Sequence, residues 1–282
     1  MHRLATEGRL LPPPQPTIPP SHDVELDEEH LPSGAAAVHE TIRADGEKEL
    51  TRTNSALMWS AIAAGMSMSF SMLATGLLQA HLPENDIGFL LSSFGYTIGF
   101  MVVVLARQQL FTENTVTAVL PLMSEPRLFK LFRLLRFWAV VLIGNLIGVA
   151  ISAYVILFMP LFDAETHKVF IGLGEHILTN DVRQMFAKGV VAGWMVATMV
   201  WLIPAAGQAK IWVILIVTYL IAIGGFTHII VGSTEVLYLV FDGKASFGDY
   251  LFKFALPTLA GNVVGGTFIF ALISHAQIRS DS

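Results

Sequence analysis

Long apolar runs constrain this chain more than any other feature of its sequence. Each of six runs approaches the roughly 20 residues that an α-helix needs to cross the hydrocarbon core of a bilayer. Hydrophobic residues make up 54% of the 282 residues and charged residues only 14%, more apolar than an ordinary soluble domain. The chain is therefore predicted to span a membrane. The runs are Leu57–Ala80, Gly88–Ala106, Phe137–Phe158, Met185–Ile203, Ile211–Phe226 and Phe254–Ile273.

Two motifs occur twice in the chain in the same order. A Phe-Thr pair opens a short apolar segment, and a Gly-Asn-x-x-Gly motif follows it 33 residues later in the first copy and 35 in the second. This spacing predicts a duplicated unit with three spans in each half. Because three is odd, the second half enters the bilayer from the opposite side, and the two inverted repeats meet near the midplane. The motifs are Phe111-Thr112 with Gly144-Asn145-Leu146-Ile147-Gly148, and Phe226-Thr227 with Gly261-Asn262-Val263-Val264-Gly265.

Two further apolar segments, Leu110–Met123 and Ile229–Phe241, are too short to cross a bilayer alone. We interpret them as the second halves of broken helices. The predicted fold is an all-α membrane protein with a transmembrane channel domain at residues 55–276, with repeats at about 55–160 and 183–275. Residues 1–54 are predicted to form a cytoplasmic Pro-rich and acidic tail with a lead-in helix, and residues 277–282 a short C-terminal tail.

Lys and Arg near the ends of the spans favour both termini in the cytoplasm, and the basic cluster at residues 127–136 contributes most of this bias. No basic stretch leads into a short apolar core of the signal-peptide type, so the first span is expected to direct insertion. The chain has no cysteine, no histidine pair spaced for zinc and no phosphate-binding glycine loop. No enzyme chemistry, cofactor, metal or nucleic-acid partner is therefore expected.

Each of the two predicted breaks has its own cause in the sequence. Arg107-Gln108-Gln109 places polar groups in an apolar run, and Gly224-Gly225 lowers helix propensity. Irregular backbone at membrane depth must be buried in protein or line a cavity. Both short helices are then expected to begin near the bilayer centre with free N–H groups and a positive dipole end, which attract an anion.

His228 is the only histidine well inside a predicted span. An ionisable group at that depth indicates function, although a core histidine satisfied by a neighbouring helix is the plainer alternative. A neutral imidazole would donate a hydrogen bond to a passing anion, and a protonated one would hold the anion more strongly or give it a proton. Thr112 is expected at the matching place in the first repeat, either as a solute contact or as a helix cap.

Other residues near the breaks carry two interpretations each. Phe100, Phe111 and Phe226 either narrow a pore or belong to the apolar core. Arg107 and Glu113 are close enough to form a structural ion pair, or Arg107 attracts anions. Glu235 either faces a vestibule or reaches water. For the repeated motif we favour close helix packing over a direct functional role; its residues are Gly144, Asn145, Gly148, Gly261, Asn262 and Gly265.

These motifs resemble the formate/nitrite transporter family from about residue 55 to 275. The resemblance rests on Leu110-Phe111-Thr112, Trp194 to Trp201, Gly225-Phe226-x-His228 and the two Gly-Asn motifs. The runs Ala106–Thr115 and Ser274–Arg279 are more similar still to the YfdC-type branch of that family.

The resemblance implies an aquaporin-like fold, a homopentamer in the bacterial inner membrane with one pore in each protomer, and passage of small monovalent anions such as formate or nitrite. By position it implies that Thr112 and His228 form a central polar pair. It also implies two apolar constrictions along the pathway, with Thr227 beside the histidine: Phe100, Leu110 and Phe111 form one, and Val196 and Ile221 the other.

The chain also departs from the family pattern. The family usually has a glutamate where this chain has Thr227, and asparagines at Gly193 and Gly232. Without that glutamate, the protonated form of the imidazole loses a favourable partner. We therefore predict an anion conduit with or without proton linkage through His228, and keep two alternatives: a channel for neutral small solutes, and a membrane scaffold or sensor that does not transport.

Overall fold

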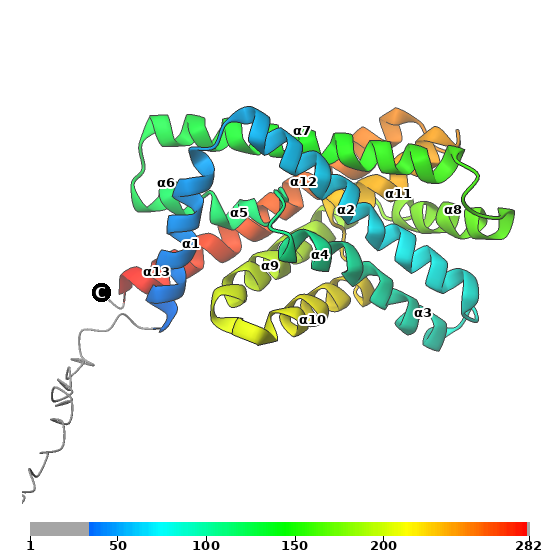
Figure 1. Ribbon diagram of the computed structural model, residues 1–282, viewed down its shortest axis with the longest axis horizontal. Coiled ribbons are helices and arrows are strands. Elements are labelled where there is room, and N and C mark those ends of the chain that lie inside the picture. Colours follow the sequence, from blue (N-terminus) through cyan, green and yellow to red (C-terminus); the bar gives the residue numbers. More distant parts are fainter. Residues whose placement is uncertain (1–33, 281–282) are drawn as a thin grey trace, which may run out of the picture. The chain divides into compact units, whose positions relative to one another are not determined.

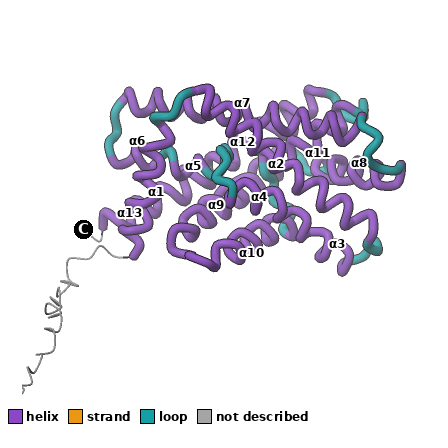
Figure 2. Tube along the Cα trace, in the orientation of Figure 1, coloured by secondary structure: helices purple, strands orange, loops and turns teal. Residues whose placement is uncertain are grey.

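The computed structural model describes residues 34–280, and these residues form helices and loops without a strand (Figure 2). The Pro-rich and acidic stretch predicted before residue 34 lies outside the described residues. Five helical segments are long and apolar enough to cross a membrane, which makes the chain a multi-pass membrane protein. They are α2 (Asn54–His81), α3 to α4 (Asp86–Leu105), α7 (Leu128–Phe158), α9 to α10 (Val182–Ile223) and the segment from η4 through α12 and η5 into α13 (Asp249–Ile278).

The fourth of these segments contains a bend. Its 42 residues comprise α9 (Val182–Ala206), the 3₁₀ turn η3 (Gly207–Ala209) and α10 (Lys210–Ile223). Pro204 lies inside α9, and Gly207 has φ 50°, a left-handed conformation that glycine adopts without a Cβ penalty. The segment therefore contains two helices, corresponding to the fourth and fifth apolar runs of the sequence.

Shorter helices complete the described fold (Figure 1). The segment after the first break was expected to form one helix, but it forms two very short ones, because Pro121 lacks an N–H and begins a new turn. After the second break a single 13-residue helix, α11, follows. The short helices are α1 (Gly34–Leu50), α5 (Asn114–Thr117), α6 (Leu120–Ser124), α8 (Ala164–Leu178) and α11 (Ile229–Phe241).

At two helix crossings the backbones lie so close together that only glycine fits at the contact. α2 packs on α7, and α9 packs on α12 (Leu256–Val263). A Cβ built on Gly148 would lie 2.2 Å from the carbonyl oxygen of Ile62, and one on Gly265 would lie 2.0 Å from that of Val190. Gly144 and Gly261 lie one turn earlier in the same two contacts, so all four repeated glycines line a helix crossing.

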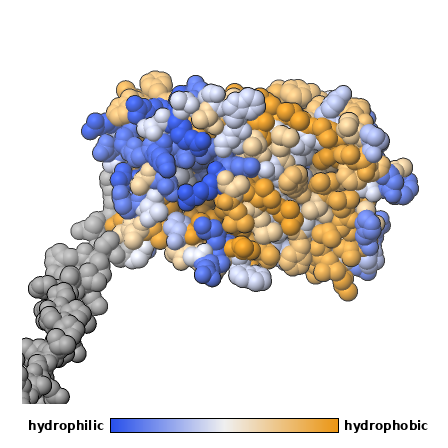
Figure 3. Space-filling model, in the orientation of Figure 1, coloured by the Kyte–Doolittle hydropathy of each residue, from blue (hydrophilic) through white to orange (hydrophobic). Residues whose placement is uncertain are grey.

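The surface of the described residues fits a bilayer environment. Large apolar side chains are exposed on several helices, among them Trp59 on α2 (70% exposed) and Trp212 on α10 (64%). Figure 3 shows apolar residues covering the part that contains α2, α4 (Tyr96–Leu105) and α10, and hydrophilic residues gathered around α1 and α6. The exposed apolar area calls for lipid or another protein chain as its neighbour.

Candidate functional site

The first break, between α4 and α5, is held by one buried asparagine. Asn145 of α7 accepts a hydrogen bond from the backbone N–H of Phe111 at 2.9 Å. Its Nδ2 donates to the carbonyl oxygens of Gln109 at 2.8 Å and Ala61 at 2.7 Å. One amide side chain thus replaces backbone hydrogen bonds that an unbroken helix would make.

The second break, between α10 and α11, is held in the same way. Asn262 of α12 accepts a hydrogen bond from the N–H of Ile229 at 2.9 Å. Its Nδ2 donates to the carbonyl oxygens of Thr227 at 3.0 Å and Gly189 at 2.9 Å. The chain turns through a left-handed residue at each break, Arg107 (φ 53°) in the first and Gly225 (φ 58°) in the second.

These bonds fix which residues of the two breaks correspond. Phe111 in the first break and Ile229 in the second donate the equivalent bond to an asparagine, and they are 118 residues apart. The residues just before them, Leu110 and His228, therefore correspond. The sequence comparison aligned Phe111-Thr112 with Phe226-Thr227, an offset of 115. That alignment was wrong by three residues, and Thr112 is not the counterpart of His228.

Thr112 and His228 nevertheless meet. Thr112 Oγ1 lies 2.7 Å from Nε2 of His228, and both side chains are buried. His228 is also the N-cap of α11, where its Nδ1 accepts the N–H of Val231 at 3.3 Å. Since Nδ1 is an acceptor, the neutral imidazole carries its proton on Nε2 and donates it to Thr112. The edge of the Phe100 ring contacts the imidazole, with centroids 5.0 Å apart.

The expectation of free N–H groups at both breaks is only partly met. The N–H groups of Phe111 and Ile229 donate hydrogen bonds to asparagine oxygens, and that of Val231 donates to His228. The helix after the first break, α5, has only four residues and so contributes little dipole. An anion would therefore meet side-chain donors at this site more than helix ends.

A cavity of about 830 Å³ extends from His228 to the surface of the described residues. Its inner part is lined by Thr227, Ile221 and Glu235, and its outer part includes the exposed side chains of Glu84 and Lys168. Segments from α2, α8, α9, α10 and α11 form its walls. Thr227 Oγ1 donates to the carbonyl oxygen of Met185 at 2.9 Å, which anchors the loop before α11 to α9.

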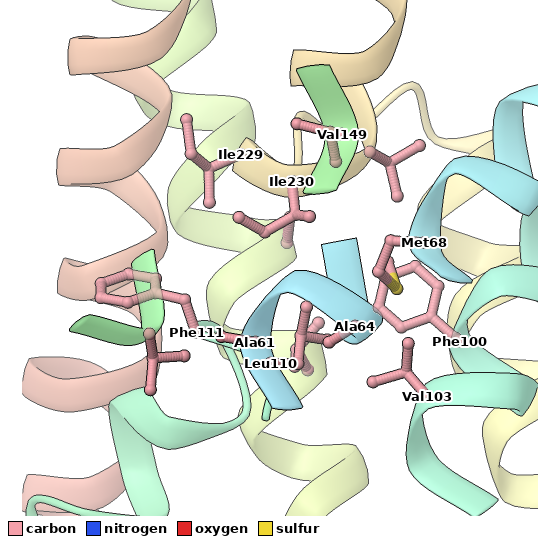
Figure 4. Packing of buried hydrophobic residues seen from close by; sticks show 14 of the residues in the cluster. Ala61, Ala64, Met68, Phe100, Val103, Leu110, Phe111, Val149, Ile229 and Ile230 are labelled. Carbon is pink, nitrogen blue, oxygen red and sulfur yellow. The ribbon is translucent and has the colours of Figure 1, made fainter. Parts of the chain in front are cut away.

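Most residues of the two expected constrictions lie in the apolar core beyond this cavity. Ile221 lines the cavity, whereas Phe100, Leu110, Phe111 and Val196 are buried and do not line it within residues 34–280. Figure 4 shows Phe100, Leu110 and Phe111 among these core side chains. Their side chains belong to one buried apolar cluster, the candidate apolar barrier of the pathway.

The Arg107–Glu113 ion pair is not formed in the described residues. Arg107 is exposed, while Oε1 of Glu113 is buried and has no hydrogen-bond partner in residues 34–280. Sequence reasoning also missed Tyr96 and Lys188, which line the cavity. Lys188 lies near the start of an apolar run and Tyr96 is a single aromatic residue within one, and neither gives a distinctive signal in the sequence.

Comparison with known proteins agrees with this geometry. The formate/nitrite transporter family model matches residues 36–276. The chain belongs to this family. It is 56% identical to the inner membrane protein YfdC of Escherichia coli over 92% of this chain and 83% of that protein. It is 27% identical to the formate-nitrite transporter of Plasmodium falciparum over 80% of this chain and 79% of that protein.

The fold also matches solved structures of the family. A pentameric formate channel with formate bound aligns with a TM-score of 0.69 and 22% identity, covering 80% of this chain and 98% of that one. An ion channel of the same family aligns with a TM-score of 0.69 and 17% identity, covering 86% of this chain and 98% of that one. The family and its structural neighbours are transporters and channels, which argues against an enzyme.

Proposed function

We propose that this protein is a membrane channel or transporter for small monovalent anions such as formate or nitrite. The observation that carries the proposal is the buried Thr112–His228 pair between the two breaks, at the inner end of a cavity that reaches the surface. Family membership and the fold of a formate channel support it. An ionisable side chain at that depth in a bilayer-spanning chain indicates a functional site.

The site residues offer suitable chemistry for a small anion. Nε2 of His228 donates to Oγ1 of Thr112, and within residues 34–280 that hydroxyl has no acceptor for its own proton. The hydroxyl proton is therefore available to a solute oxygen. Beyond the pair, buried Phe100, Leu110 and Phe111 exclude water and small cations alike. Val196 and Ile221 are proposed to narrow the pathway as a second apolar constriction.

The proposed architecture is six spans in two inverted repeats of three, assembled as a pentamer in the bacterial inner membrane with both termini in the cytoplasm. Counting α9 and α10 as separate spans gives the sixth, and the matching asparagine bonds at the two breaks support the repeat. The aligned formate channel is pentameric, which supports the oligomer.

A channel for neutral small solutes is the second candidate. Two observations favour it: the imidazole of His228 is fixed in a neutral form by its cap bond, and the carboxyl group of Glu235 lines the same cavity. Neither feature attracts an anion. The scaffold or sensor alternative depended on the tail before residue 34, which lies outside the described residues, and it stays a prediction.

Flux measurements test the proposal directly. We expect proteoliposomes with the unaltered protein to take up formate or nitrite between about pH 5 and pH 8, and His228→Ala to lower that flux about tenfold or more. His81→Ala is the matched control, because His81 is exposed and lies outside the cavity lining. Light scattering after size exclusion verifies the pentamer in each preparation. Absence of flux of either anion in folded pentameric protein would refute the assignment.

A further inference from the structure

Glu235 is the one carboxyl group deep in the cavity, and the anion pathway leaves it without a role. It lies seven residues after His228, about two turns along the same face of α11. Glu235 is only 8% exposed, and it lines the cavity. No hydrogen bond or ion pair within residues 34–280 reaches its carboxylate. A buried carboxyl group without a partner, aimed into a solute cavity, points to a role with the solute.

The cavity lining contains other titratable groups. Besides Glu235, the lining includes the titratable side chains of Tyr96, Glu84, Glu165, Lys168, His176 and Lys188. Glu84, Glu165 and Lys168 are exposed, and Lys168 pairs with Glu165 at 2.8 Å. Lys188 donates to Oδ1 of Asn180 at 2.6 Å. None of these groups neutralises Glu235 by a direct contact.

The elements packed against α11 supply no counter-charge for Glu235 either. Helix α12 has no titratable residue, and α2 has only His81 at its end. Helix α7 has a basic segment at residues 130–136 and Tyr154, and α8 adds His167 and Glu175. The segment η4 (Asp249–Ala255) has Asp249, Tyr250 and Lys253, of which Tyr250 bonds to Ser233 and Lys253 pairs with Asp249. None of these side chains lines the cavity.

His228 is poorly placed to give a proton to the solute. Both of its ring nitrogens are occupied: Nε2 by Thr112 and Nδ1 by the N–H of Val231. A second proton on Nδ1 would face that N–H donor and remove the cap of α11. A solute that needs a proton must therefore obtain it from another group in the cavity.

A carboxylate anion and Glu235 cannot both stay ionised in a cavity with low-dielectric walls. Two carboxyl groups that share such a site hold one proton between them, because the repulsion of two like charges is weakly screened there. A monocarboxylate anion that enters the cavity must then meet Glu235 in its protonated form. The pair of solute and Glu235 carries a single negative charge.

We propose that Glu235 is the proton donor that converts the incoming anion into its undissociated acid before it passes the Thr112–His228 pair. The O–H bond of the Glu235 carboxyl group breaks, and an O–H bond forms on the solute oxygen. The neutral acid crosses the apolar barrier, and the Glu235 carboxylate regains a proton from the water of the cavity. One proton thus accompanies each solute, so the substrate class is weak acids. This inference rests on the proposed function.

The test compares formate uptake by the unaltered protein, Glu235→Gln and Glu235→Asp in proteoliposomes, with a pH dye inside the vesicles. Glutamine keeps the shape of the side chain but has no acidic proton, and aspartate restores the carboxyl group. At neutral pH we expect one proton to enter with each formate in the unaltered protein. We expect Glu235→Gln to take up formate at least about tenfold more slowly there, with the deficit shrinking as the pH falls, and Glu235→Asp to recover much of the rate.

Glu175→Gln is the matched control, because Glu175 is an exposed carboxyl group of α8 outside the cavity lining. A structural role for Glu235 would lower flux equally at every pH, so the change in the pH profile is the decisive result. If Glu235→Gln takes up formate with the unaltered rate, pH profile and proton count, the proton-donor role is refuted while the proposed function stands. If the unaltered protein carries neither formate nor nitrite, both are refuted.

Discussion

At the scale of single residues, the two buried asparagines determine how the breaks are built. Asn145 and Asn262 each make three hydrogen bonds to backbone groups. Asn145→Leu would fill the same space but leave the N–H of Phe111 and the carbonyl group of Gln109 unpaired, at about 1–3 kcal/mol each. We expect the melting temperature of the purified protein to fall by more than about 10 °C. The same result is expected for Asn262→Leu.

Asn54→Leu is the control for this experiment, because Asn54 is exposed and makes one side-chain bond, to Arg136. Its melting temperature should stay within a few degrees of the unaltered protein, about the effect of 1 kcal/mol or less. Equal melting temperatures for Asn145→Leu and Asn54→Leu would show that the first break does not depend on the asparagine.

The sequence predicted the site residues better than it predicted their correspondence. Thr112 and His228 were placed at the breaks because polar residues interrupt the first apolar run and two glycines the second, and they meet. Their assignment to matching positions failed, because the Phe-Thr pair is a likeness in sequence only, whereas the bonds from the asparagine side chains to the backbone pair other residues of the two breaks. Only the asparagine contacts reveal the true offset, and they connect residues more than 30 positions apart.

At the scale of secondary-structure elements, the crossing of α9 and α12 depends on a missing side chain. A Cβ on Gly193 would lie 2.2 Å from the carbonyl oxygen of Asn262, where backbone must move to make room. Gly193→Ala is expected to destabilise the protein by about 1–3 kcal/mol, as overpacking does. Gly172→Ala on α8 meets no atom within 4 Å and should be neutral or stabilising by up to about 1 kcal/mol.

Thermal unfolding in one detergent measures both glycine variants side by side. If Gly193→Ala melts at or above the temperature of Gly172→Ala, the crossing has room that the structure does not show. The missing Cβ at position 193 is what lets α9 and α12 approach this closely. The glycine is therefore coupled to the helix spacing of this chain.

Helix lengths explain which elements the sequence predicted. The long apolar runs became helices because about 20 apolar residues have few other stable arrangements in a bilayer. Helix α8 (Ala164–Leu178) was missed, because charged residues shorten its apolar run. Its buried residues Thr166, Phe170 and Gly174 recur every fourth position, a helical period that would have indicated it.

At the scale of the whole described molecule, α1 joins the start of the chain to its end. Nε2 of His39 lies 3.1 Å from Nδ1 of His275 on α13 (Leu272–Ser280), 236 residues away, and the His39 ring contacts Trp201 of α9. Figure 1 shows α1 beside α13 and α6. The contact between α1 and α13 thus includes a pair of histidines.

This pair makes the docking of α1 depend on pH. Burial lowers the pKa of His39, and the neighbouring charge of His275 lowers it further, outweighing Glu40, which raises it. Undocked α1 therefore takes up a proton more readily than docked α1. The docked state keeps its full stability above about pH 6.5 and loses it progressively as the pH falls below that value.

Spin labels on a double cysteine variant measure the docking, since the chain has no cysteine of its own. Ala44→Cys on α1 and Gln277→Cys on α13 are exposed positions, and labelled chains are diluted with unlabelled ones so that each proposed pentamer carries one labelled chain. The distance between the labels should be narrowly distributed at about pH 8 and broaden towards about pH 5. In His39→Phe, which cannot take up a proton, the distribution should change little with pH. Broadening of equal size in both proteins would assign the pH response to other groups, because phenylalanine keeps an aromatic ring beside Trp201 but has no group that takes up a proton.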